Sequence, residues 1–125
     1  MPAEFDVRTL VFLIRADGAP NLDDDALDAL QRKHLAYGAD LAARGITVAN
    51  GPMRQQSDIR LRGMSVYTVG ADEALAIAEQ DPMVLAGHLR VEVALWCVGA
   101  GKVAFPLHAE PVGQRLTFEQ MDELD

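Results

Sequence analysis

The chain has 125 residues, of which 50% are hydrophobic and 24% are charged, and 19 acidic against 11 basic side chains give a formal net charge of -8. A chain of this length forms one domain with a single core and needs neither disulfides nor a structural metal. Its acidic balance argues against nucleic acids and anionic membranes as partners, because binding to phosphates relies on clustered Lys and Arg.

The first predicted element is a strand over residues 7–14, which are mostly β-branched or apolar and are followed by turn residues at 17–20. Both faces of this strand are apolar, so we expect both to be covered. A long helix follows, from an N-cap at Asn21 to Arg44 and Gly45, with acidic residues in its first turn. His34 lies in the middle of its apolar stripe.

The next predicted elements are strands over residues 46–50 and 64–69, separated by a polar stretch. A helix over residues 71–80 ends at Asp81, because Pro82 disfavours the helical conformation in the residue before it. Residues 83–87 are predicted as a turn, and a last strand over 88–98 has one wholly apolar face. The order β-α-β-β-α-β predicts an α+β fold, the ferredoxin-like plait, in which both helices cover one face of an antiparallel sheet.

The second face of that sheet has no helix to cover it. Ala94, Trp96 and one side of the first strand lie on this face, so we expect a homodimer in which a second copy covers it. Residues 1–98 form the predicted domain and residues 99–125 a C-terminal arm. Within the arm, residues 102–105 are predicted to add an edge strand to their own sheet or to the partner's, and residues 117–121 to form a helical turn. A frayed tail is the alternative.

The single cysteine, Cys97, excludes an internal disulfide and favours the cytosol, and we interpret it as a small core residue. The chain begins with acidic residues and no basic segment before an apolar stretch, so no signal peptide is expected. Its apolar runs are shorter than the ~18 residues of a membrane helix. We therefore expect a cytoplasmic protein.

His34 and Asp81 are the candidate catalytic residues. Each has a structural alternative: a core histidine with a backbone partner, and a turn-forming Asp before Pro. If they meet, the carboxylate accepts one imidazole N–H, and the other nitrogen is left as a base near neutral pH. Glycine loops for phosphate, nucleophile elbows and paired metal-ligand histidines are absent from the sequence, so no cofactor and no metal are expected.

Arginines at positions 54, 60 and 62 stand close together in an otherwise acidic chain. A solvated loop explains them, and the functional alternative is that one of them binds a substrate carboxylate through paired N–H bonds. Arg62, nearest to a strand, is the preferred candidate, and Arg8 is a further one. His88 and His108 have no evident partner.

The chain resembles the YciI-like (YCII-related) proteins over about residues 7–98. The resemblance rests on the order and spacing of several short motifs. These are His34-Leu35 before the glycine that ends the first helix, Asn50-Gly51-Pro52, Gly63, Glu73-Ala74, Asp81-Pro82, and Ala86-Gly87 before a strand with Val91 and Trp96.

This resemblance implies a dimeric α/β barrel built from two plaits, with His34 and Asp81 in the pocket. The superfamily is similar to muconolactone isomerases, and one family member acts as a dehydrochlorinase. The family often has Ser directly after the glycine of the third strand, where this chain has Met64 before Ser65, and an aromatic residue where it has Met83. A shift by one residue turns a strand side chain to the other face, and Tyr67, on the same face as Ser65, is an alternative phenolic donor.

Together these features predict a cofactor-independent lyase or isomerase in which His34, oriented by Asp81, moves a proton on a carbonyl or phenolic substrate. Ser65, Tyr67 and Arg62 are the predicted substrate-binding residues. The alternative is a noncatalytic dimeric module that binds a small organic acid or docks on a partner protein. A monooxygenase of the same superfamily, haem-dependent or cofactor-free, ranks lower because no axial histidine can be identified.

Overall fold

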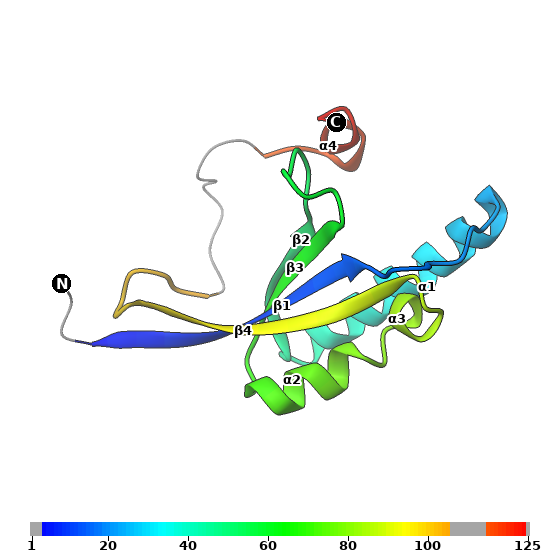
Figure 1. Ribbon diagram of the computed structural model, residues 1–125. Coiled ribbons are helices and arrows are strands. Elements are labelled where there is room, and N and C mark those ends of the chain that lie inside the picture. Colours follow the sequence, from blue (N-terminus) through cyan, green and yellow to red (C-terminus); the bar gives the residue numbers. More distant parts are fainter. Residues whose placement is uncertain (1–3, 106–114, 125) are drawn as a thin grey trace.

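The computed structural model describes residues 4–105 and 115–124. They form one antiparallel sheet in the strand order β2-β3-β1-β4, with three helices on one of its faces (Figure 1). This confirms the predicted α+β, ferredoxin-like fold. The elements in chain order are β1 (Phe5–Arg15), α1 (Asp24–Ala43), β2 (Thr47–Pro52), β3 (Leu61–Tyr67), α2 (Ala71–Ala78), α3 (Pro82–Leu85), β4 (Leu89–Gly99) and α4 (Phe118–Asp122).

The core lies between the sheet and the helices α1 and α2. Val11 of β1 is 1% exposed and packs with Leu41 of α1, Tyr67 of β3, and Ala74 and Ala78 of α2. The small side chains of α2 let this helix approach the sheet closely. Odd-numbered residues of β1 therefore face the helices, and even-numbered ones face the opposite side of the sheet.

Three local expectations are wrong. The N-cap of α1 is Asp23, whose carboxylate accepts the Ala26 N–H at 2.8 Å, and not Asn21, which lies too far before the first helical residue. The predicted turn at residues 83–87 begins as the short helix α3, with Pro82 at its first position. Residues 102–105 form no strand, because the chain turns at Gly101 and then turns the Val103 carbonyl to the Arg8 side chain.

Beyond the helices, β1 and β4 continue as a two-stranded ribbon. The pairing of β1 with β4 runs from Phe5 and Gly99 to Arg15 and Leu89, whereas its pairing with β3 begins only at Thr9. Figure 1 shows this ribbon extending past α2. Cys97 lies on it and is exposed, so its interpretation as a core residue is wrong for this chain. The ribbon also exposes the apolar side chains Phe5, Val7, Leu95 and Trp96.

The C-terminal helix α4 confirms the helical turn predicted near residues 117–121. Thr117 caps it: its hydroxyl accepts the Gln120 N–H, and the Gln120 side chain accepts the Thr117 N–H, which is a capping box. The helix contacts the loop between β2 and β3 through an ion pair of 2.9 Å between Arg54 and Asp122. Among the residues that the structure describes, no helix is both long enough and apolar enough to cross a membrane.

Candidate active site

The structure brings His34 and Asp81 together. His34 Nδ1 lies 2.6 Å from Asp81 Oδ2, joining the middle of α1 to the start of α3. Because an ionised carboxylate only accepts hydrogen bonds, Nδ1 is the donor of this bond, and in the neutral imidazole the lone pair is then on Nε2. The Asp81 side chain is 8% exposed and that of His34 is 24% exposed, so the carboxylate is buried while the imidazole still reaches solvent.

The backbone fixes the Asp81 carboxylate. Asp81 is the N-cap of α3, and its Oδ1 accepts the Met83 N–H at 2.8 Å while Oδ2 is left for His34. Pro82 suits the first helical position, since that position needs no N–H donor. The Asp-Pro pair, which taken alone predicts only a turn, therefore positions an imidazole on another helix.

Two tyrosines lie beside the pair. The Tyr37 hydroxyl donates to the Ile77 carbonyl at 2.7 Å and so joins α1 to α2. Burial, followed by the charge of nearby Asp81, raises the pKa of Tyr37. Burial, with smaller contributions from Tyr37 and Asp81, raises the pKa of Tyr67 to about 12. Both phenols are therefore neutral hydrogen-bond donors near pH 7.

Ser65 shares the helix-facing side of the sheet with Tyr67. Ser65 pairs with Val11 on one side and with Asn50 on the other, and Tyr67 pairs with Thr9. The Asn50 side chain lies against Gly38, one helical turn after His34, where a Cβ would stand 3.6 Å from the amide nitrogen. The extra residue before Ser65 therefore does not turn this serine away from the helices.

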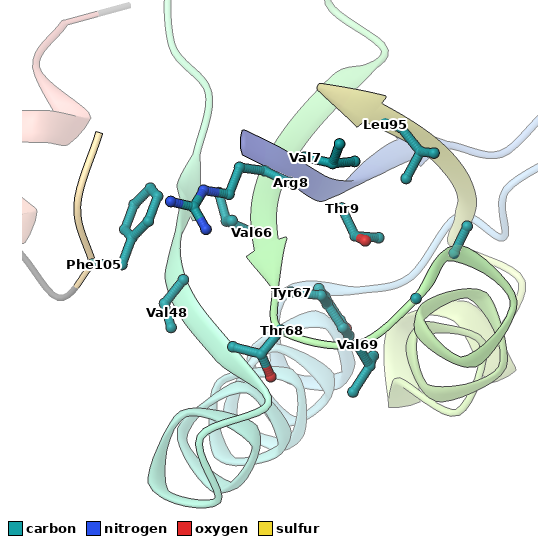
Figure 2. Close-up of a pocket in the computed structure, with 12 residues that line it drawn as sticks. Val7, Arg8, Thr9, Val48, Val66, Tyr67, Thr68, Val69, Leu95 and Phe105 are labelled. Carbon is teal, nitrogen blue, oxygen red and sulfur yellow. The ribbon is translucent and has the colours of Figure 1, made fainter. Parts of the chain in front are cut away.

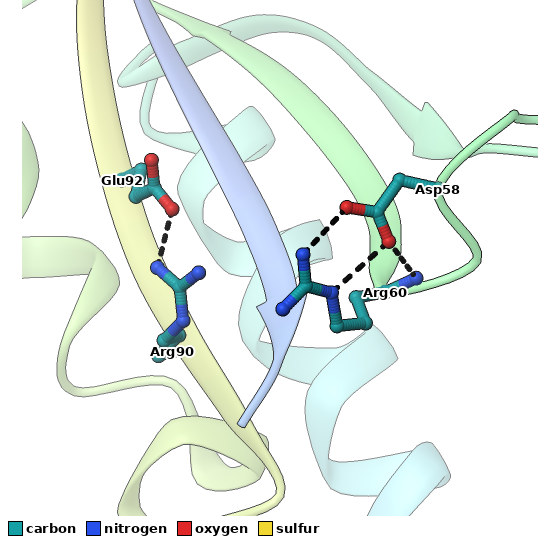
Figure 3. A network of polar contacts seen from close by, with 4 residues as sticks. All are labelled: Asp58, Arg60, Arg90 and Glu92. Carbon is teal, nitrogen blue, oxygen red and sulfur yellow. Dashed lines mark hydrogen bonds and ion pairs between the residues drawn. The ribbon is translucent and has the colours of Figure 1, made fainter. Parts of the chain in front are cut away.

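The side chains of Arg60 and Arg62 make their hydrogen bonds within their own loop. Arg62 lies at a register shift of β3, and its guanidinium donates to the Ile59 carbonyl at 3.2 Å. Arg60 is bound to Asp58, and these hydrogen bonds lower the pKa of the Asp58 carboxyl to about 2 (Figure 3). Within the described part of the chain, no hydrogen bond or ion pair joins Arg62 to His34 or Asp81. A single copy of the chain therefore does not support the predicted role of Arg62 in substrate binding.

A cavity of about 590 Å³ opens at the end of the sheet where β3 stops (Figure 2). Tyr67 lines it, but neither His34 nor Asp81 does. The candidate proton-transfer pair is therefore not part of the lining of this cavity. The hydrogen bonds and the burial of His34 and Asp81 mark this pair as the candidate active site.

The other histidines of the sequence are His88 and His108. His88, directly before β4, has a buried Nδ1 without a partner among the described residues. His108 lies outside the described residues. In ranges 4–105 and 115–124 no three His, Cys, Asp or Glu side chains gather as a metal site would require. The sequence reasoning did not single out Tyr37, although its place in the stripe of His34 was a signal that could have found it.

Comparison with known proteins identifies the family of this chain. The family model described as the YCII-related domain matches residues 10–97, which include β1 to β4 and both members of the pair. The chain belongs to the YCII-related family. No curated protein matches this member of the family.

One similar solved structure is the 5-chloro-2-hydroxyhydroquinone dehydrochlorinase from Burkholderia phenoliruptrix AC1100, in complex with 2,5-dihydroxybenzoquinone. It is 20% identical to this YCII-related chain, with a TM-score of 0.43, and the match covers 70% of this chain and 92% of that one.

Proposed function

We propose that this protein is a cofactor-independent enzyme, a lyase or isomerase, that moves a proton on a small carbonyl or phenolic molecule. The observation that carries the proposal is the 2.6 Å hydrogen bond from His34 Nδ1 to the buried Asp81 carboxylate. A histidine held in one tautomer by a carboxylate is a typical general base near neutral pH.

In this mechanism His34 Nε2 takes a proton from a carbon next to a carbonyl, or from a phenol, and the electron pair of that bond moves into the substrate. The resulting imidazolium keeps its hydrogen bond to Asp81, which is a positioning residue. Return of the proton to another carbon gives an isomerisation, and departure of an anion gives an elimination. The neutral Tyr67 phenol is the proposed donor to the substrate oxygen, with Ser65 on the same face.

Substrate discovery and variant comparison test this proposal together. A panel of small keto acids, lactones and halogenated hydroquinones is incubated in D₂O, and deuterium incorporation and halide release are followed by NMR and ion analysis. For a compound that reacts, His34→Asn and Asp81→Asn are each expected to lower the rate by about 10²–10⁴-fold. His88→Gln, which changes a histidine outside the pair, is the matched control. Rates equal to the parent in both pair variants contradict the proposal, as does a panel in which nothing reacts.

We also propose that the protein is a homodimer. The open face of the sheet carries Leu10, Phe12 and Ala94, and the ribbon exposes Trp96 and Phe5. Apolar side chains on an uncovered sheet face favour a second copy as the occupant.

A further inference from the structure

The cavity at the end of the sheet has walls suited to an organic molecule. It lies beside the part of β1 that extends past Tyr67, the last residue of β3. Its volume of about 590 Å³ is in the range of ligand sites. The apolar part of its lining comes from Val7, Val48, Val66, Val69, Leu95 and Phe105 (Figure 2).

Arg8 brings a positive charge to this lining. Its Nη2 donates to the Val103 carbonyl at 3.1 Å, and its guanidinium carbon lies 5.5 Å from the centre of the Phe105 ring. Its Nε is buried and has no hydrogen-bond partner among the described residues. Asp6 is 3.9 Å from Nη2, but that carboxylate oxygen also accepts the Gly101 N–H at 2.9 Å. The charge of Arg8 is thus only partly compensated, and donors remain for an anion.

Two residues with hydroxyl groups, Thr9 and Tyr67, line the same cavity and are 7% and 6% exposed. Figure 2 shows Arg8 and Thr9 projecting to opposite sides of β1, so that Arg8 lies with Phe105 on one side and Thr9 with Tyr67 on the other.

The start of α2 adds further donors. Gly70 and Ala71 line the cavity, and the helix has no side-chain cap. Its first backbone N–H groups have no partner within the helix, and they favour negative charge. Asp72 and Glu73 of this turn are exposed, so they do not fill the cavity.

We propose that this cavity is a binding site for a small carboxylate with an aromatic or apolar body, whose carboxylate is bound by Arg8. The planar guanidinium and the carboxylate form paired, charge-assisted hydrogen bonds. Val66 and Phe105, which lie on the same side of the sheet as Arg8, contact the apolar body. The site lies apart from His34 and Asp81, and its occupancy does not depend on proton transfer by that pair.

Benzoate and benzyl alcohol test the proposal, because they share a ring and differ in charge. Each is titrated into the full-length protein while ¹H–¹⁵N NMR spectra are recorded. We expect benzoate to bind at least about tenfold more tightly than benzyl alcohol, and Arg8→Gln to weaken benzoate binding by about 10- to 100-fold. Arg44→Gln removes an exposed arginine at the C-cap of α1 and is the matched control, with unchanged binding expected.

Contacts measured in the unaltered protein make the result independent of how Arg8→Gln folds. We expect nuclear Overhauser effects between the benzoate ring and the methyl groups of Val48 and Val66. Equal affinities for the two probes overturn the proposal, as do contacts confined to other methyl groups. Undiminished benzoate binding by a folded Arg8→Gln protein does so too.

Discussion

Tyr37 donates its hydroxyl hydrogen to the backbone carbonyl of Ile77 over 2.7 Å, joining the helix that carries His34 to the helix that leads into Asp81. The Ile77 carbonyl also accepts the Gln80 N–H at 3.1 Å. It therefore keeps a partner when the tyrosine hydroxyl is removed.

Tyr37→Phe is expected to lower the free energy of unfolding by about 0.5–1.5 kcal/mol, the net contribution of one hydrogen bond whose acceptor stays partnered. Urea denaturation followed by circular dichroism measures this. A loss well above ~2 kcal/mol would mean that the hydroxyl supports more than this one contact.

Asp81 has two separable tasks, and two variants distinguish them. Asp81→Ala removes both the cap of α3 and the partner of His34, whereas Asp81→Asn keeps an oxygen that can cap. We expect the Ala variant to be less stable than the Asn variant by about 1 kcal/mol, which is typical of a lost cap. Asp23→Ala, which removes the cap of α1, is the matched control for stability.

The same variants report on the imidazole. In the parent, ¹⁵N-detected NMR above neutral pH is expected to show the proton of His34 on Nδ1. In Asp81→Asn the amide can donate to Nδ1, so the proton moves to Nε2 and the base is lost. Asp23→Ala should leave the tautomer unchanged. An unaltered tautomer in Asp81→Asn contradicts the assignment of Asp81 as the positioning residue.

His88 makes stability depend on pH. Burial, followed by the charges of Arg15 and Arg62, lowers the pKa of His88 below its usual 6.5. Between the lowered pKa and 6.5 the unfolded chain binds more protons than the folded one, so stability falls as the pH drops below about 6.5. We expect the urea midpoint to fall less between pH 7.5 and 5.5 in His88→Gln than in the parent. Identical decreases in the two proteins contradict this origin of the pH dependence.

Light scattering tests the proposed homodimer. Trp96 is 40% exposed and pairs with Arg8 on the face of the sheet that the helices leave open. We expect a dimer at micromolar concentration for the parent and a monomer, or a much weaker dimer, for Trp96→Glu. Ile59→Glu places the same charge on a 75% exposed loop residue and should remain dimeric. A monomeric parent protein contradicts the proposed homodimer.

Much of the fold could be predicted from the sequence, because its local patterns agree with the final packing. Alternation in β4 and the stripe of α1 placed the core face correctly, and residues 10–97 match the family model. The cap of α1 was missed because several neighbouring polar residues are suitable caps, and only the helix start selects Asp23. Whether Cys97 is buried or exposed depends on how far β4 extends beyond the helices, and no local sequence pattern predicts that length.

The candidate site was less predictable. His34 and Asp81 are 47 residues apart in sequence, and only the packing of α1 against α3 joins them. Arg62 was chosen for its closeness to a strand, but the irregular register of β3 decides where its guanidinium lies. The cavity beside Arg8 depends on where β3 stops relative to β1 and on the turn at Gly101, and these are long-range features.

The Asp81 carboxylate both caps α3 and binds His34, and this couples the motion of α3 to that of the imidazole. Helix α3 has only four residues, and Asp81 both begins it and holds the imidazole of α1. Each transient opening of this single turn therefore frees the imidazole to rotate, and each closing restores its alignment. The fraction of time for which the base is correctly aligned is set by the local opening equilibrium of α3, and amide exchange at Met83 would measure it.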